Sequence, residues 1–321
     1  MSGARSTKYR DIETVARSGG TLQRMAVRIP TYLTDLRENP AWLPMFLLAR
    51  TMPFRKAHWL AAKAVPPDTT AFPSMFGDHD AAEIAQQLRT NGIFTGLALP
   101  DDIREEISRF GRETSCFGNF ERGLEFLPAA HEEAEQRFGR PILSGHHFER
   151  VLQCSAAVAV QKDPLLLTIA QHYLGGQAKP ITIRTWWSFP TRNVFNKDLS
   201  RASFKYHFDL DDWRMLKFFF YLSDVDADTG PHVYIRGSHS RRRLKHQFTL
   251  LVGHPAEEVL HFYGEQNVLT LTGKAGMGFV EDPFGFHRGT PAKKHPRLMM
   301  EVGFGVSKPS RRRYHGEPVI R

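Results

Sequence analysis

The sequence predicts an α+β fold, in which helices precede a mainly β core built as an antiparallel barrel or sandwich. Residues 180–305 form a succession of short strand-like runs punctuated by Gly, Pro, Asn and Asp. Helical patterns are concentrated before residue 175, and no regular crossover helices separate the later runs. The length of 321 residues fits one large domain with an appendage, or two ordinary domains.

The elements before residue 180 are defined by helix caps and by Gly and Pro stops. A Pro-rich stretch at 65–77 is the best candidate linker. The expected elements are, in order, a helix capped by Asp78 or Asp80 that ends at Asn91-Gly92, a strand over 92–99, a helix over 101–113 with Asp101 as its cap, and one apolar helix over 156–174 that ends at Gly175.

The β part consists of runs rich in β-branched and aromatic residues. A single helical insertion, over 256–264, interrupts the series. The expected strands lie within 181–190, 203–211, 215–225, 232–238, 267–273, 276–283 and 297–306.

Most of the net charge lies in an N-terminal extension, residues 1–75. This extension holds 11 Lys and Arg against 5 Asp and Glu, and therefore contributes +6 of the formal net charge of +9. Further basic clusters occur at 236–245 and 308–313. We expect two parts, the basic helical extension over 1–75 and a domain over 76–321 whose barrel core spans about 180–307.

The extension has three interpretations. It is a helical appendage that packs on the domain, an interfacial segment that lies on anionic lipid, or a nucleic-acid-binding arm. In the lipid interpretation its aromatic residues Trp42, Phe46, Phe54 and Trp59 face the acyl boundary. Nucleic acid is not expected as a partner, because no recognised nucleic-acid-binding motif accompanies the charge.

Composition argues against a disordered or fibrous protein, a disulfide scaffold and an integral membrane protein. Two cysteines, Cys116 and Cys154, cannot form a disulfide framework, so we expect a reducing cytoplasm as the location, with peripheral contact at a membrane surface as the variant. The apolar run 41–49 is far shorter than the roughly 20 residues of a membrane span. The first residues lack the apolar core of a signal peptide.

The most informative motif is His207-Phe208-Asp209. On a strand, residues i and i+2 point to the same face, so His207 and Asp209 offer a nitrogen and an oxygen to one point. His287, which begins a polar turn at the end of a later β run, is the candidate third ligand. Two histidines and one carboxylate with open positions form the facial triad of non-haem Fe(II) oxygenases. Among fifteen histidines a chance match is easy, and the pair His147 and Glu149 is the alternative site.

The surroundings of this motif resemble the phytanoyl-CoA dioxygenase family of Fe(II)- and 2-oxoglutarate-dependent oxygenases. The resemblance covers roughly 80–307, is strongest over 204–305 and has no counterpart for 1–75. Its elements are His207-Phe208-Asp209, Leu222-Ser223-Asp224-Val225-Asp226, Asp228-Thr229-Gly230-Pro231, Gly237-Ser238-His239, His287 and Arg297.

The resemblance implies a double-stranded β-helix, a jelly-roll or cupin-like barrel with the N-terminal helices packed around it. It also implies Fe(II), 2-oxoglutarate and O₂ as cofactor and cosubstrates, with His207, Asp209 and His287 as ligands and Arg297 holding the 2-oxoglutarate carboxylate. Arg suits a bidentate contact with a carboxylate better than Lys does. Oxidative decarboxylation then yields succinate and CO₂, and the carboxylate of Asp209 favours hydroxylation over halogenation.

Four further residues are weaker candidates, each with a structural alternative. Thr290 and Thr185 are candidates for cosubstrate binding, although Thr290 can equally shape a turn. Trp187 and Tyr221 are candidates for substrate binding, although aromatic residues on strands are more often core. Which face of the run 215–221 lines the cavity depends on the register of the sheet.

Three functions are therefore compared. The leading hypothesis is a dioxygenase that hydroxylates an aliphatic C–H of a small-molecule or lipid-like substrate, and the basic charge favours an anionic one. The alternatives are a cupin-like metalloenzyme that does not use 2-oxoglutarate, and a non-catalytic binding module on the same fold. Specificity lies in pocket loops that follow no transferable code, so an acyl-CoA, a sugar or lipopolysaccharide precursor and a secondary metabolite are all candidate substrates.

Overall fold

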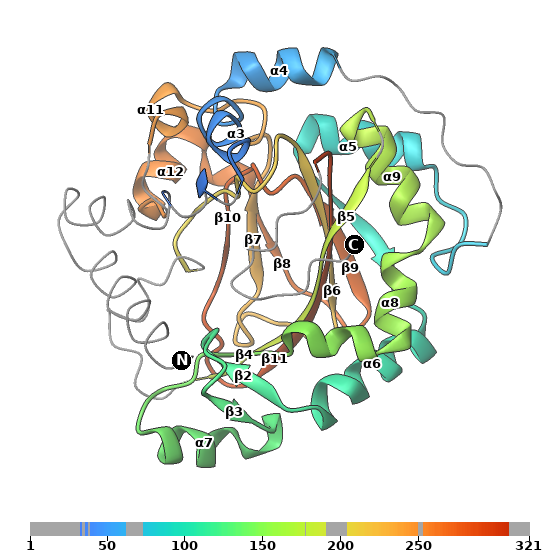
Figure 1. Cartoon of the computed structure of the whole chain (residues 1–321), viewed down its shortest axis with the longest axis vertical. Helices are drawn as coiled ribbons and strands as arrows, with labels where there is room; N and C mark the ends of the chain where they lie inside the picture. Colours follow the sequence, from blue (N-terminus) through green and yellow to red (C-terminus); the bar gives the residue numbers. More distant parts are fainter. Residues whose placement is uncertain are drawn as a thin grey trace.

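Two antiparallel sheets form the centre of the computed structural model (Figure 1), which describes residues 33, 36–37, 39–61, 73–176, 178–190, 204–249 and 253–307. Among these residues the larger sheet has eight strands, in the order β1 (Ile93–Ala98), β9 (Met277–Glu281), β6 (Met215–Tyr221), β11 (Arg297–Gly305), β5 (Lys179–Ser188), β4 (Ser144–His146), β2 (Cys116–Gly118) and β3 (Glu125–Phe126). The smaller sheet contains β10 (His287–Gly289), β7 (His232–Ile235) and β8 (Val268–Leu271).

The space between the two sheets is filled by side chains of both. Phe219, Phe279 and Met299 of the larger sheet form one buried cluster with Tyr234 and Leu271 of the smaller sheet. Sheets that face each other across such a core, with antiparallel pairing throughout, form a jelly-roll barrel. The predicted double-stranded β-helix with an α+β composition is confirmed.

Helices cover the outer face of the larger sheet. These are α5 (Ala81–Asn91), α6 (Asp101–Glu113), α8 (Ser155–Gln161) and α9 (Pro164–Leu174), which lie along one side of the strands (Figure 1). Phe218 and Phe220 of β6 and Met300 of β11 belong to the same buried cluster as residues of these helices. Side chains alternate along a strand, so Lys217, Phe219 and Tyr221 face the barrel interior. This settles the register question that the sequence left open.

The remaining elements border the barrel. They are α3 (Trp42–Leu48), α4 (Met52–Leu60), α7 (His131–Phe138), α11 (Leu244–Gln247) and α12 (Ala256–Tyr263), with the 3-10 helices η1 (Pro128–Ala130), η2 (Phe148–Gln153) and η4 (Glu265–Asn267).

Four expectations about local structure were wrong in detail. The helical insertion over 256–264 is not single, because α11 precedes it between β7 and β8. The single helix over 156–174 is divided into α8 and α9, because Pro164 lacks an N–H and the Asp163 carboxylate instead accepts the Leu165 N–H (2.9 Å). Asp101 lies inside the first turn of α6 and does not cap it, whereas Asp80 caps α5 as expected. The described part of 203–211 is no regular strand, since Tyr206 and His207 each form only an isolated bridge.

The described part of the N-terminal extension packs against the domain. Arg50 Nη1 donates to the Thr249 carbonyl (2.7 Å), and the Met52 N–H donates to Gln247 Oε1 (2.9 Å). Trp59 Nε1 donates to the Tyr173 carbonyl at 3.2 Å, and the Phe54 ring lies 5.2 Å from that of Trp213. Phe54 and Trp59 therefore contact protein, as the packed-appendage interpretation expects. The domain boundary remains a prediction.

Among the described residues, the basic cluster 236–245 is not wholly exposed. The cluster 308–313 lies outside the described residues. Within 236–245, Arg242 is buried, and its guanidinium lies 4.0 Å from the ring centroids of Phe208 and Phe284. Within the described ranges, no helix is both long enough and apolar enough to cross a membrane.

Candidate metal centre

His207 and His287 are brought together by backbone pairing. The His207 N–H donates to the His287 carbonyl, and the His287 N–H donates back to the His207 carbonyl, each at 2.9 Å. Residues that exchange both bonds lie directly opposite each other with side chains on one face. The two imidazole centroids are accordingly 4.4 Å apart. His287 begins β10, so it lies in a strand and not in the turn that the sequence suggested.

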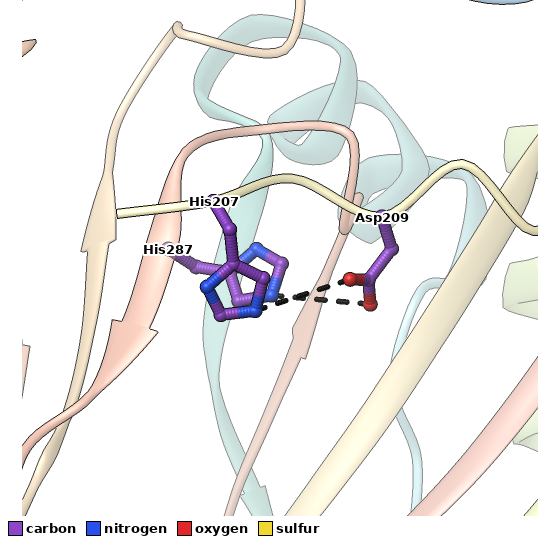
Figure 2. A group of neighbouring side chains, drawn as sticks. All are labelled: His207, Asp209 and His287. Carbon is purple, nitrogen blue, oxygen red and sulfur yellow. Dashed lines mark ion pairs between the residues drawn. The ribbon is translucent and has the colours of Figure 1, made fainter. Parts of the chain in front are cut away.

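Asp209 completes the group from the same segment as His207 (Figure 2). Its N–H donates to the Pro283 carbonyl (2.8 Å), which fixes the backbone beside the segment that carries His287. His207 Nε2 lies 3.9 Å from Asp209 Oδ1, and His287 Nε2 lies 3.9 Å from Asp209 Oδ2 (Figure 2). One ligand atom of each residue lies within 4.8 Å of the others, so the structure brings together the three residues predicted from the motif.

Both imidazoles are oriented for coordination through Nε2. His207 Nδ1 lies 2.9 Å from the Lys205 carbonyl, and His287 Nδ1 lies 3.0 Å from the Gly285 carbonyl. A carbonyl only accepts, so Nδ1 carries the proton and Nε2 keeps its lone pair. Burial, and then the neighbouring His207, lower the pKa of His287 to about 4, so His287 is neutral at pH 7. A carbonyl behind a histidine in this way is a regular feature of metal-binding histidines.

A buried lysine that sequence reasoning missed positions the carboxylate. Lys217 Nζ donates to Asp209 Oδ2 at 2.7 Å and lies 3.8 Å from Glu301 Oε1. Burial alone would raise the pKa of Asp209, but Lys217 and the two histidines hold it below its ordinary value. Arg184 and Thr182 also bind Glu301. The available signal was a charged residue at position 217, and another at 301, inside otherwise apolar strands.

Removing the Lys217 ammonium should leave the Asp209 carboxylate without its hydrogen-bonded cation. For Lys217→Met in metal-free protein we expect the free energy of unfolding to fall by about 3–5 kcal/mol, the usual effect of breaking a buried pair. A divalent ion that binds the group should restore part of this loss, because it supplies positive charge beside Asp209. Urea unfolding with and without Mn²⁺ measures both effects.

The control for that experiment is an exposed ion pair with the same distance between nitrogen and oxygen. Lys274 Nζ lies 2.7 Å from Asp224 Oδ2, but both side chains are largely in solvent. Lys274→Met should change the free energy of unfolding by less than about 1 kcal/mol, with no response to Mn²⁺. Equal losses in the two variants would contradict the role given to Lys217.

Arg297 lies on the interior face of β11, four residues from Glu301 on the same side. Its Nη1 donates to the Gly230 carbonyl, its Nη2 donates to Ser188 Oγ (3.1 Å), and its Nε has no hydrogen-bond partner. The side chain is 5% exposed, and burial lowers its pKa. Among the described residues it forms no ion pair, so it is a buried cation with capacity for an anionic ligand.

His232 links Arg297 to the three candidate ligands. Its ring centroid lies 5.6 Å from that of His287, and its Nε2 lies 2.9 Å from Glu281 Oε2. Burial, and then the charge of Arg297, lower the pKa of His232 to about 3, while burial raises the pKa of Glu281 to about 7. The interior between the metal group and Arg297 is therefore lined by a neutral imidazole. Neither His232 nor Glu281 was a candidate from the sequence.

Two weaker candidates lie near this interior with their hydroxyls already engaged. Tyr221 faces inward, donates to the Leu271 carbonyl (2.8 Å) and accepts the His232 N–H (3.1 Å). Thr290 donates to the Pro231 carbonyl at 2.7 Å, which is the contact of a turn-shaping residue. Each oxygen retains at most a further acceptor role, so neither is a strong polar contact for a ligand.

Thr185 and Trp187 lie on the wrong face of β5 for the roles considered. Thr185 Oγ1 lies 3.1 Å from His147 Nδ1, and Trp187 Nε1 donates to the Gly111 carbonyl (2.8 Å) in the helical layer. The expectation that they line the cavity is corrected, because the strand's alternation sends Trp186 and Arg184 inward instead.

The alternative site at His147 and Glu149 is not assembled. His147 is fully buried against β5, whereas Glu149 is half exposed and binds Arg122. Within the described residues these two side chains form no group with metal-binding geometry.

Buried His147 should instead make stability depend on pH. Burial lowers the pKa of His147 from 6.5 to about 4, so between these values the unfolded chain binds a proton that the folded protein does not. The contribution of His147 to the free energy of unfolding should therefore have its full value above pH 6.5. It should fall by about 3 kcal/mol between pH 6.5 and pH 4. In His147→Gln the decline should be smaller by that amount. Parallel urea-unfolding profiles from pH 7 to 4 would contradict this.

Fold and site together define a two-sheet antiparallel barrel with a candidate mononuclear metal centre, two histidines and one carboxylate, in its interior. No family model and no curated protein matches the chain.

The chain is similar to several solved structures. One is the non-heme alpha ketoglutarate dependent epimerase SnoN from nogalamycin biosynthesis, solved with Fe³⁺, alpha ketoglutarate and nogalamycin RO (13% identity, 71% of this chain, 84% of that chain, TM-score 0.48). Another is EctD from S. alaskensis with 2-oxoglutarate and 5-hydroxyectoine (19% identity, 80% of this chain, 91% of that chain, TM-score 0.48). A third is AviO1 from Streptomyces viridochromogenes Tue57 (15% identity, 73% of this chain, 98% of that chain, TM-score 0.44). Identities and TM-scores this low say nothing about the activity of this chain.

Proposed function

We propose that the protein is an Fe(II)- and 2-oxoglutarate-dependent dioxygenase that hydroxylates an aliphatic C–H of a small-molecule or lipid-like substrate. The observation that carries this proposal is the convergence of His207, Asp209 and His287 in a barrel interior that also contains the unpaired buried cation Arg297. Neither feature alone distinguishes this class of enzyme, but together they supply a metal-binding group and a carboxylate-binding group in one interior.

The donor set fits Fe(II). Two Nε2 atoms with free lone pairs and one ionised carboxylate are the three protein ligands of mononuclear non-haem iron, and they leave positions open for cosubstrates. Bound Fe(II) and 2-oxoglutarate supply the oxidising chemistry, in which O₂ is consumed, 2-oxoglutarate is converted to succinate and CO₂, and one oxygen atom enters a substrate C–H.

The surroundings fit 2-oxoglutarate. Arg297 has an unpartnered Nε–H and no competing carboxylate among the described residues, so it can bind the distal carboxylate of the cosubstrate. Ser188, which already accepts from Arg297, holds the guanidinium in place. The neutral ring of His232 lies on the same interior side and adds no second positive charge.

The rest of the interior is mainly apolar. Trp186, Phe219 and Met299 pack together on the inner faces of β5, β6 and β11. A lipid-like or aliphatic substrate is compatible with this apolar lining, and the formal net charge of +9 favours a substrate that also carries negative charge.

The test is a succinate-release assay with the full chain, Fe(II) and 2-oxoglutarate across acyl-CoAs, sugars and lipids. Succinate formation that needs all three components and rises with one substrate supports the proposal. Substrate turnover without 2-oxoglutarate would point to a cupin-like metalloenzyme of another class. Iron-loaded protein that binds a substrate without any turnover would indicate a binding module.

Contact of residues 1–75 with anionic membranes is a separate part of this proposal, supported by their surplus of basic residues. Co-sedimentation with vesicles that contain phosphatidylserine, lost at high salt, would support it. Unchanged co-sedimentation after deletion of residues 1–65 would overturn it.

A further inference from the structure

A second group of potential metal ligands lies outside the candidate metal centre, in the insertion that follows β7. It consists of His246 on α11, His254, which forms an isolated bridge with Tyr206, and Glu258 on α12. His246 Nε2 lies 2.7 Å from Glu258 Oε1, and His254 Nδ1 lies 3.7 Å from the same oxygen. One ligand atom of each residue lies within 4.8 Å of the others.

The two imidazoles are held in place by the protein interior. Both are buried, and His254 Nε2 has no hydrogen-bond partner. Burial lowers the pKa of each, so both are neutral at pH 7. The His246 Nε2 proton faces Glu258, and an ion can replace it when that proton moves to Nδ1, which lies 3.5 Å from the Tyr263 hydroxyl. Glu258 is only partly buried and gives the group an opening to solvent. A small ion can therefore reach three preformed donors without unfolding the insertion.

We propose that His246, His254 and Glu258 bind a divalent transition metal ion of the Zn²⁺ type at a site separate from that of His207. In tetrahedral zinc sites, bonds of about 2.0–2.1 Å place neighbouring ligand atoms about 3.4 Å apart. The observed separations of 2.7 and 3.7 Å lie on either side of this value. Two histidines and one carboxylate leave the fourth position to water.

Lys245 competes with the ion for the carboxylate. Its Nζ lies 2.9 Å from Glu258 Oε1, but its side chain is 51% exposed and can turn into solvent. The Lys245 ammonium and a metal ion thus bind the same oxygen in alternative states. If the cluster is only structural, removing Lys245 should lower the stability of the protein and have no effect on metal binding. If the cluster is a metal site, removing Lys245 should increase its affinity for the metal ion.

The second group lies directly behind the candidate metal centre. The His254 N–H donates to the Tyr206 carbonyl (2.7 Å), and the Phe286 ring lies 5.0 Å from His246 and 5.3 Å from His254. Tyr206 and Phe286 immediately precede His207 and His287 in the chain. A metal ion in the insertion would brace the two segments that carry the histidines of the other site, so its role is structural.

The experiment counts Zn²⁺ bound to full-length, metal-depleted protein in a His287→Ala background, which weakens the other group. Equilibrium dialysis against Zn²⁺ should give one ion per chain, and Zn²⁺ should raise the Tm. Adding Glu258→Gln or His254→Ala should weaken Zn²⁺ binding at least tenfold, and adding Lys245→Met should tighten it severalfold. The matched controls are Glu257→Gln and His261→Ala, exposed residues of the same helix, which should retain the ion.

Two results would overturn the proposal. One is a folded His287→Ala protein, judged by circular dichroism, that binds no Zn²⁺ at micromolar concentration. The other is equal Zn²⁺ affinity in the Glu258→Gln and Glu257→Gln proteins. If His254→Ala does not fold, the Glu258→Gln and Lys245→Met proteins still decide the question, because both changes are at partly exposed side chains. The outcome does not depend on whether the other site binds iron.

Discussion

Replacing His287 with alanine is expected to abolish Fe(II) binding and 2-oxoglutarate-dependent turnover. His287 Nε2 is one of only three donors that converge in the described interior around Asp209. Changes to groups that merely orient a ligand already weaken metal binding by about 10–100-fold, so loss of the ligand itself should exceed about 100-fold in both iron affinity and turnover. Iron content after desalting and succinate release measure the two effects.

The His287→Ala protein should nevertheless fold. The pairing between His207 and His287 uses backbone N–H and carbonyl groups, which alanine retains. The matched control is His295→Ala, an exposed histidine eight positions further along the chain, which should keep full iron content and activity. A folded His287→Ala protein with unchanged iron content and turnover would show that the iron site is elsewhere.

Replacing Arg297 with lysine is expected to raise the KM for 2-oxoglutarate by about 10–100-fold while leaving iron affinity unchanged. A hydrogen bond to a charged group contributes about 1.5–3 kcal/mol, and each 1.4 kcal/mol corresponds to about tenfold in affinity. Lysine keeps the positive charge but cannot form the two parallel bonds that a guanidinium offers to a carboxylate. The change should therefore appear mainly in KM, with a smaller effect on kcat.

Two measurements separate this role from a structural one. Arg297 also binds the Gly230 carbonyl and Ser188, so the Tm of Arg297→Lys must be compared with its KM. Arg236→Lys, at an exposed position just after β7, should change neither. An unchanged KM for 2-oxoglutarate in a folded, iron-loaded Arg297→Lys protein would remove Arg297 from the cosubstrate site.

The local pattern of residues predicted most of the elements and the candidate ligands. Helix α5 begins at the Asp80 cap and ends at Gly92 because caps and left-handed glycines act within a few residues of themselves. His207 and Asp209 lie two positions apart, a spacing that brings side chains together over short range. His287 was reached through the resemblance, because nothing local links it to Asp209.

The isolated sequence did not reveal which strand face is the interior. Thr185 and Trp187 looked as suitable as Arg184 and Trp186, because a period of two describes both faces of β5 equally. Only the packing of α6 and α8 against one face decided that Trp187 belongs to the core and Trp186 to the barrel.

The amino-acid sequence by itself determined the antiparallel β core, most helix ends and the pairing of His207 with Asp209, since these depend on spacing and local backbone preferences. Only the tertiary structure decided that Lys217 binds Asp209, that Arg297 is buried without an acidic partner, and that His246, His254 and Glu258 meet. The physical reason is that burial and charge pairing arise between segments far apart in the chain, and these depend on how the two sheets and the insertion pack.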